Sequence, residues 1–145
     1  MNRFKEVSII SLLLVISELF LSYVLQLVTF AAIGSARAGA GSAVTMILGA
    51  AAVIIINVIC IVLVNKNQLN LEHMSSGMII GNALYCLLMI FLFSHIPVPY
   101  SLVPKGEMAL GLIQILIQII DCVAGGVFIL IGGVLLLYTK HKKNE

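Results

Sequence analysis

The chain has 145 residues, of which 61% are hydrophobic and only 10% are charged, and its formal net charge is +2. Soluble domains contain about 45–50% apolar and about 25% charged residues. This composition, with a mean hydropathy of +1.18, therefore argues against an ordinary soluble enzyme and predicts an integral membrane protein. The basic residues sit at the chain ends and in loops, where they indicate membrane topology and not nucleic-acid binding.

Four long apolar runs determine the expected fold class, which is all-α. A membrane-spanning helix needs about 20 apolar residues, and we predict spans at residues 7–33, 43–64, 75–95 and 108–138. None of these runs alternates polar and apolar residues as the strands of a membrane barrel do. We therefore expect a single membrane domain over residues 1–145, built as an integral four-helix transmembrane bundle.

The first run, residues 7–33, follows the basic residues Arg3 and Lys5 and could be read as a signal peptide. Its apolar length is well beyond the ~7–15 residues of a signal-peptide core, so we favour a retained first span. Small residues in the segment 31–43 resemble a cleavage site, and processing therefore stays open as the alternative.

The second and third spans are separated by a short polar loop and are expected to form a hairpin. Asn57 and Asn82 lie at matching distances from this loop, about 10 Å from the membrane edge at 1.5 Å per residue. We predict a hydrogen bond between these two side chains, with a substrate contact as the alternative. Gly77 and Gly81 form a small-xxx-small pair, which favours close helix packing.

The fourth span carries a polar stripe along one helix face. Its members recur at steps of three and four residues: Gln114, Gln118, Asp121 and Gly125, with Gly132 continuing the spacing. Polar groups that occupy one face of a spanning helix are expected to point into the bundle, away from lipid. Gly125 and Gly132 should let a partner helix approach closely along this face.

The first span offers a matching face, on which Ser22 lies one turn after Glu18. We expect the first and fourth spans to face each other and to bring Glu18 and Asp121 near one cavity, because buried carboxyls are costly in lipid and mark candidate functional groups. Three interpretations stay open. The carboxyls could be neutral and hydrogen-bonded to Gln114, Gln118 or Ser22; they could relay protons or cations; or they could bind a cationic or polar ligand.

Lysine and arginine are distributed unevenly between the predicted loops, and this sets the expected orientation. The side that holds both termini carries Arg3, Lys5, Lys66, Lys140, Lys142 and Lys143, whereas the other side carries Arg37 and Lys105. Basic residues concentrate on the cytoplasmic side of membrane proteins. We therefore expect a multi-pass protein of the cell membrane with both its N-terminus and its C-terminus in the cytoplasm.

No metal site or cofactor is expected, because the histidines are scattered and form no metal-binding motif. The cysteines lie inside apolar runs and are interpreted as small hydrophobic residues. The sequence also contains no nucleophile motif and no phosphate-binding loop, so enzyme activity is not expected, although an intramembrane enzyme that uses Asp121 is kept as a third hypothesis.

The primary functional hypothesis is a non-enzymatic accessory, regulatory or immunity protein that acts through helix–helix contacts in the lipid bilayer, with another membrane protein or itself as partner. The alternative is a small proton- or cation-linked transporter or channel subunit that uses Glu18 and Asp121. With its lone glutamate, Glu18, in the first of four predicted spans, the chain resembles the small proton-coupled multidrug exporters in that one feature. The chain is longer and has a strong charge bias, so no family is assigned on this basis.

Overall fold

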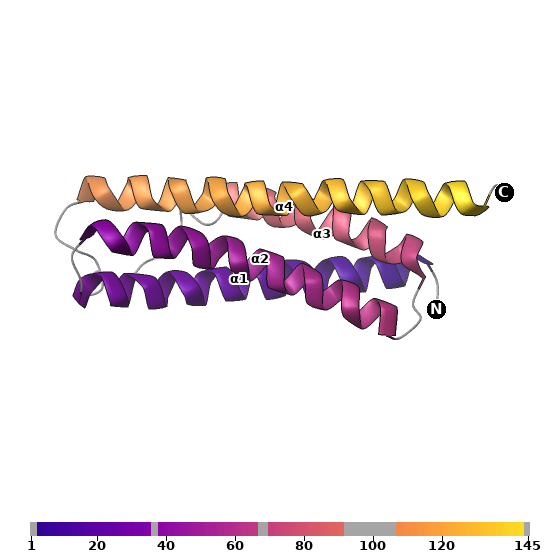
Figure 1. Ribbon diagram of the computed structural model, residues 1–145, viewed down its shortest axis with the longest axis horizontal. Helices are drawn as coiled ribbons and strands as arrows, with labels where there is room; N and C mark the ends of the chain where they lie inside the picture. Colours follow the sequence, from indigo (N-terminus) through magenta and orange to yellow (C-terminus); the bar gives the residue numbers. More distant parts are fainter. Residues whose placement is uncertain (1–2, 36–37, 67–69, 92–106, 144–145) are drawn as a thin grey trace.

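The computed structural model describes residues 3–35, 38–66, 70–91 and 107–143, and within these ranges it describes the side chains except at 26, 29–35, 38–46, 64–65, 107–114 and 117. The described chain is all-helical. It forms four α-helices: α1 (Arg3–Ser35), α2 (Ala38–Lys66), α3 (Leu71–Phe91) and α4 (Glu107–Lys143). The helices run side by side along one long axis, and both chain termini lie at the same end (Figure 1).

Three helices contain the whole of the predicted spans 7–33, 43–64 and 108–138, and α3 begins earlier than its predicted span 75–95. The reason lies in Asn70, whose side-chain Oδ1 accepts a hydrogen bond from the backbone N–H of Glu72 at 3.0 Å. Asparagine is a favoured residue at this N-terminal capping position, so α3 includes a polar first turn that hydropathy alone does not predict. Residues 92–95 lie outside the described part of the chain.

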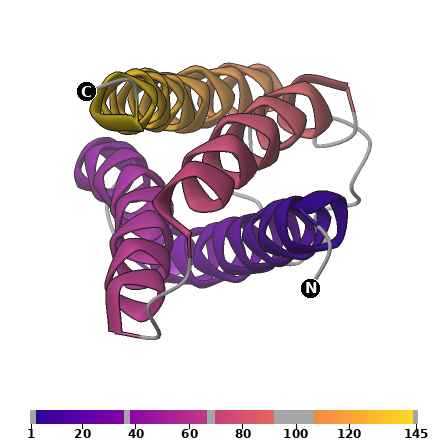
Figure 2. The same ribbon diagram turned by 90° about the vertical axis from the view of Figure 1, so that its right-hand side faces the viewer.

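The helices follow the order α1, α2, α4, α3 around the bundle axis (Figure 2). α3 packs on α1 and α4, and α2 packs on the same two helices, whereas α2 and α3 touch little although they are consecutive in sequence. Within the described residues, α1 and α4 occupy diagonal positions. The first and fourth spans therefore do not pack directly on each other, although their polar faces both point to the central axis of the bundle.

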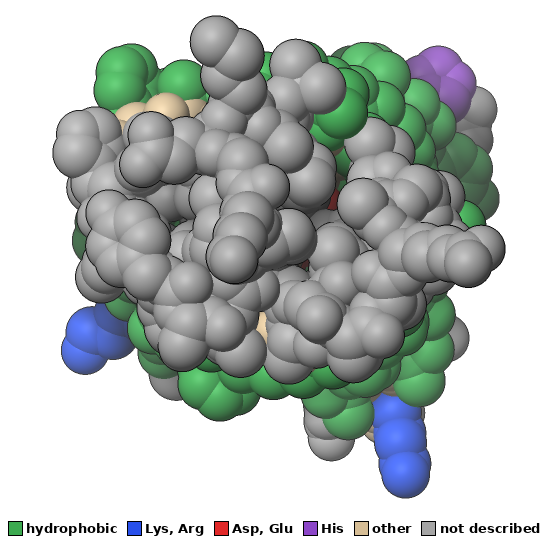
Figure 3. Space-filling view, turned by 90° about the vertical axis from the view of Figure 1, so that its left-hand side faces the viewer, with side chains coloured by type: hydrophobic (Ala, Val, Ile, Leu, Met, Phe, Trp, Pro, Cys, Tyr) green, Lys and Arg blue, Asp and Glu red, His purple; other side chains and the backbone are tan. Residues whose placement is uncertain are grey.

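Three helical segments are long and apolar enough to cross a membrane: Arg3–Leu25, Leu71–Phe91 and Gln118–Lys143. The described side chains of α2 include a shorter apolar segment, Ile47–Leu63. Large apolar side chains face outward on all four helices, and in the view along the bundle from the end opposite the termini, hydrophobic side chains lie around much of its rim (Figure 3). A surface of this kind suits a protein that is surrounded by lipid.

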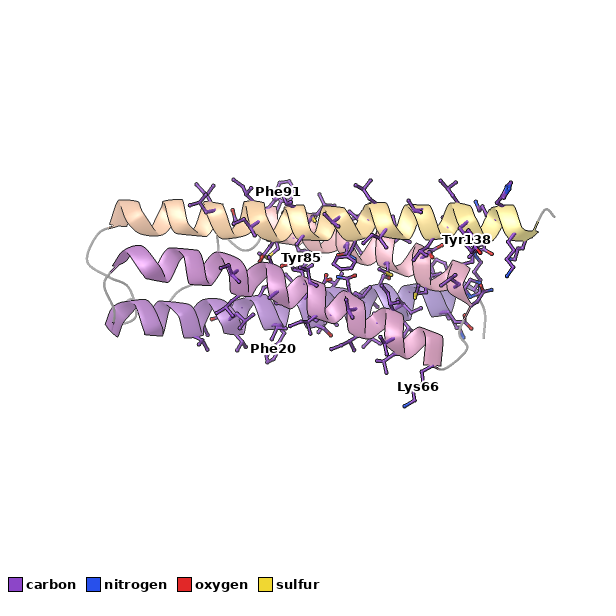
Figure 4. All side chains as sticks on the ribbon, viewed as in Figure 1. Phe20, Lys66, Tyr85, Phe91 and Tyr138 are labelled. Atoms are coloured by element: carbon purple, nitrogen blue, oxygen red, sulfur yellow. The ribbon has the colours of Figure 1, made fainter. Side chains whose placement is uncertain are left out.

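Aromatic side chains illustrate the same division between outside and inside. Phe20, Phe91 and Tyr138 are 68%, 66% and 62% exposed, and they point away from the bundle, whereas Tyr85 lies between the helices (Figure 4). The apolar part of the interior consists of residues contributed by all four helices: Leu14, Val15, Val53, Met74, Met78, Tyr85, Met89 and Phe128.

Glycines allow the helices to approach closely at two seams. Gly77 and Gly81 of α3 face α1, where a Cβ on Gly77 would lie 2.7 Å from Ile10 Cγ2. Gly125 and Gly132 of α4 face α3, where a Cβ on Gly132 would lie 3.2 Å from the backbone oxygen of Ser75. Both seams need a residue without a side chain.

Ion pairs join three helices at the end that carries the termini. Glu72 of α3 accepts contacts from Lys143 Nζ of α4 at 2.6 Å and from Arg3 Nη2 of α1 at 3.1 Å, one on each carboxylate oxygen. Next to it, His73 Nδ1 lies 2.6 Å from Glu6 Oε2 of α1. These contacts hold the N-terminal turns of α1 and α3 beside the last turn of α4.

Candidate functional site

Two carboxyl side chains lie in the centre of the bundle. Glu18 of α1 and Asp121 of α4 are both 0% exposed. Other described residues on the same helix faces are also almost inaccessible, namely Ser11 and Ser22 on α1 and Phe128 on α4. The periodic spacing of polar residues on α1 and α4 thus places both carboxyls at the axis, even though the two helices are diagonal to each other.

Glu18 belongs to a layer of amide contacts that reaches α2 and α3. Asn57 Nδ2 donates a hydrogen bond to Glu18 Oε1 at 2.5 Å. Asn82 Nδ2 in turn donates to Asn57 Oδ1 at 2.9 Å, and the reverse contact measures 3.3 Å. The structure therefore brings Asn57 and Asn82 together, and it adds Glu18 as a third member that the hairpin argument did not include.

The two asparagines are oriented by their own helices. Asn57 Nδ2 also lies 2.9 Å from the carbonyl oxygen of Val53, and Asn82 Nδ2 lies 2.9 Å from that of Met78, in both cases one turn earlier in the helix. These local hydrogen bonds hold the amides in fixed rotamers. The Asn57 amide is therefore oriented toward Glu18 by a hydrogen bond to its own helix.

Asp121 belongs to a second layer, in which a tyrosine is the central member. Tyr85 Oη of α3 donates a hydrogen bond to Asp121 Oδ2 at 3.1 Å and lies 2.8 Å from Ser22 Oγ of α1. Ser22 follows Glu18 by one turn, and Tyr85 follows Asn82 by three residues, so the two layers are stacked along the bundle. Together they connect all four helices through polar side chains.

Each carboxyl has one oxygen that no described group satisfies. Among the described residues, Glu18 Oε2 and Asp121 Oδ1 are buried without a hydrogen-bond partner, as is the donor Gln118 Nε2 one turn before Asp121. A charged, unpaired carboxylate in an apolar interior is costly, and it is normally neutralised by a proton or a cation. The arrangement is therefore suited to bind and release a small positive species.

Gly49 of α2 provides the space for Asp121. A Cβ on Gly49 would lie 2.6 Å from Asp121 Oδ1, closer than side-chain atoms approach each other. Gly49, Val53 and Asn57 follow each other at steps of four residues, so all three lie on the face of α2 that points to the site. Gly49 therefore leaves room for Asp121 Oδ1 where any other residue would place its Cβ.

Sequence reasoning identified several of these residues and missed others. Gln118 lies on the buried face of α4, and the side chain of Gln114 lies outside the described residues. Tyr85 and Gly49 were not predicted as site residues, although Tyr85 continues the spacing of Asn82 and Gly49 continues that of Asn57. This helical spacing was the signal in the sequence that could have placed both residues at the site.

Thiol groups border the site between α3 and α4. Cys86 Sγ lies 3.6 Å from the carbonyl oxygen of Cys122, and Cys122 Sγ lies 3.7 Å from that of Cys86. Neither thiol touches the carboxyls through a hydrogen bond in the described structure. Groups of three or more possible metal ligands do not occur among the described residues.

No protein-family model, no curated protein and no solved structure matches the chain.

Proposed function

We propose that the chain is a four-span protein of the cell membrane with both termini in the cytoplasm. Two observations support this proposal: α2 has 29 residues, about 44 Å at 1.5 Å per residue, and the end with both termini is rich in lysine and arginine. Labelling of a Lys140→Cys variant, with the native cysteines replaced, tests it. A membrane-impermeant maleimide should react only after permeabilisation, and reaction in intact cells would refute the proposed orientation.

Within this architecture, the function that the geometry supports best is that of a small proton- or cation-linked transporter or channel subunit. Glu18 and Asp121 are its binding groups. The observation that carries this proposal is that both carboxyls are completely inaccessible, come from diagonal helices, and each retain one oxygen without a described partner. Ionisable side chains placed in this way form the proton and ion paths of many pumps and transporters. No covalent chemistry is required of the chain.

Proton flux into liposomes that contain the purified protein tests this function. Glu18→Gln and Asp121→Asn keep the shape of each side chain and remove its exchangeable charge, so each is expected to reduce flux to the level of empty liposomes. Glu6→Gln, which changes a carboxyl outside the site, is the matched control and should retain flux. Equal flux in all three variants and the wild type would exclude the proposal.

A second candidate function is the accessory, regulatory or immunity type, in which another membrane protein or a second copy is the partner. One observation favours it: a Cβ on Gly126 or Gly133 of α4 would meet no described atom within 4 Å. These two glycines are one heptad apart on an outer face of α4, so another helix could approach closely there. The inward-facing Gly125 and Gly132 are already used inside the bundle.

Co-purification from native membranes in mild detergent tests the accessory function. Gly126→Leu and Gly133→Leu fill the outer face without entering the bundle, and they should remove a bound partner while the purified chain stays folded. Val134→Leu changes an exposed residue nearby and serves as the control. A partner that is retained by both leucine variants, or the absence of any partner with the wild type, would contradict this function.

A further inference from the structure

The two buried carboxyl groups have no basic partner inside the bundle. Lysine, arginine and histidine are absent from the helical stretches 6–35, 38–65, 74–91 and 107–139. Glu18 and Asp121 are 0% exposed, and Glu18 Oε2 and Asp121 Oδ1 have no described hydrogen-bond partner. A carboxylate that stays charged in such an interior is costly, so each group needs a positive species from outside the chain. A metal cation and a proton both meet this need, but they require opposite surroundings.

The group that contacts Glu18 is a hydrogen-bond donor. Asn57 Nδ2 donates to Glu18 Oε1, and the same nitrogen donates to the carbonyl oxygen of Val53. A carbonyl oxygen can only accept, so this second contact fixes which end of the Asn57 amide faces Glu18. The amide oxygen, Asn57 Oδ1, is already engaged by Asn82 Nδ2. A metal cation beside Glu18 Oε1 would therefore meet an N–H group where it needs an oxygen ligand.

Asp121 also accepts from a donor. Tyr85 Oη donates to Asp121 Oδ2, and because the phenol has one hydrogen, it must accept in its contact with Ser22 Oγ. Both hydroxyl hydrogens thus point along the chain toward Asp121. Donors of this kind stabilise a carboxylate, whereas burial disfavours it. A carboxyl group held between these two effects can take up and release a proton.

The backbone around the site is regular helix. Glu18, Asn57, Tyr85 and Asp121 all lie well inside the bounds of α1, α2, α3 and α4, so the carbonyl groups around them serve helical hydrogen bonds. In transporters, Na⁺ is coordinated by carbonyl groups that an unwound helix sets free, and Mg²⁺ and Ca²⁺ take about six or more oxygen ligands. The described residues leave one carboxyl oxygen free in each layer, which is enough for a proton.

We propose that the site binds protons and not metal cations, with one proton on Glu18 Oε2 and one on Asp121 Oδ1. Each is the oxygen that its layer leaves without a donor. The other oxygen of each carboxyl is occupied by Asn57 or Tyr85, so the two groups do not share one proton as a directly bonded pair. Uptake forms one O–H bond on a carboxylate, and release breaks it. This inference rests on the proposed transport function, for which it names the ion.

Infrared difference spectroscopy of the full-length chain in lipid bilayers tests the inference while the pH is changed. A protonated carboxyl group gives a C=O stretching band that its anion lacks. Glu18→Gln and Asp121→Asn should each remove a different band from the pH-induced spectrum of the wild type. Glu6→Gln changes a carboxyl outside the site and should retain both of these bands. Exchange of Na⁺ for N-methylglucamine at fixed pH should change neither band.

Three outcomes would overturn the inference. A band that responds to Na⁺, Mg²⁺ or Ca²⁺ at fixed pH, and that Asp121→Asn or Glu18→Gln removes, would identify a metal cation as the ligand. Loss of both bands in either single variant, with the helix content of the wild type by circular dichroism, would mean one shared proton. Bands that do not change at any pH would mean that the protons are not released.

The proposed transport function fails in a different way. If the two bands respond to pH as expected but liposomes that contain the wild type show no proton flux, the proton sites stand and the transport function does not. If Na⁺ crosses these liposomes and Glu18→Gln or Asp121→Asn abolishes its flux, transport stands and the proton is the wrong ion.

Discussion

At the scale of single residues, Tyr85 is the side chain on which the second polar layer depends. Its hydroxyl is the one group that contacts both Ser22 of α1 and Asp121 of α4 within the described structure. The ring is 0% exposed, so water cannot replace either contact. A buried polar group that loses its partner costs more than the hydrogen bond itself contributed.

Tyr85→Phe is expected to lower the free energy of unfolding by about 1–3 kcal/mol, because it leaves Asp121 Oδ2 and Ser22 Oγ without the phenol between them. Reversible unfolding in bicelles measures the change. Tyr138→Phe removes the same hydroxyl from an exposed ring and should be neutral. Equal effects of the two substitutions would show that the phenol of Tyr85 does not support the site.

At the scale of helices, α4 uses adjacent glycines in opposite ways. Gly132 points into the bundle, where a Cβ would lie 3.0 Å from Ile79 Cγ1 and 3.2 Å from the Ser75 carbonyl oxygen. Gly133, its neighbour in sequence, has no described atom within 4 Å of that position. The close packing of α4 on α3 thus depends on Gly132 and not on Gly133.

Gly132→Ala should destabilise the protein by about 1–3 kcal/mol, because the added methyl group must push α3 away at a backbone atom that cannot rotate aside. Gly133→Ala places the same methyl group in open space, so it should not destabilise the protein, and the higher helix propensity of alanine should favour the variant by up to about 1 kcal/mol. The same unfolding assay distinguishes them. A larger loss for Gly133→Ala would mean that the outer face of α4 is the packed one.

The helices and their buried faces could be predicted from the sequence, but which helices pack against each other could not. Spacing places Glu18 and Asp121 on inward faces, but an inward face specifies only the axis and does not say which helix lies opposite. Hydropathy likewise cannot find Tyr85, which counts as apolar, or Gly49, whose role is to leave room for Asp121 Oδ1. These assignments require the register between helices, which depends on contacts such as Gly77 against Ile10.

At the scale of the whole molecule, Glu72 closes the bundle at the end that holds the termini. It is in contact with the first turn of α1 and the last turn of α4, segments that are at opposite ends of the sequence. The polar layers around Glu18 and Asp121 and the ion pairs of Glu72 therefore connect the helices at two separate places. The central layers are shielded from solvent, and the ion pairs are accessible to salt.

Glu72→Gln is expected to lower the melting temperature in detergent at low ionic strength and to speed hydrogen exchange in the first turn of α1 and the last turn of α4. High salt should reduce the difference between variant and wild type, since it screens exposed ion pairs. Lys66→Gln removes a charge that has no described ion-pair partner and should change neither quantity. A difference that persists at high salt would assign the effect to packing.

On the proposed four-span topology, the polar layers have a consequence for the order in which the helices are inserted. Translation proceeds from the N-terminus, so Glu18 enters the membrane well before Asn57, its donor, which follows 39 residues later in the chain. Asp121 enters after its own donor Tyr85, which precedes it by 36 residues. On that topology, Glu18 of α1 is in the bilayer without its Asn57 donor until α2 is inserted, whereas Asp121 of α4 is inserted after its donor Tyr85.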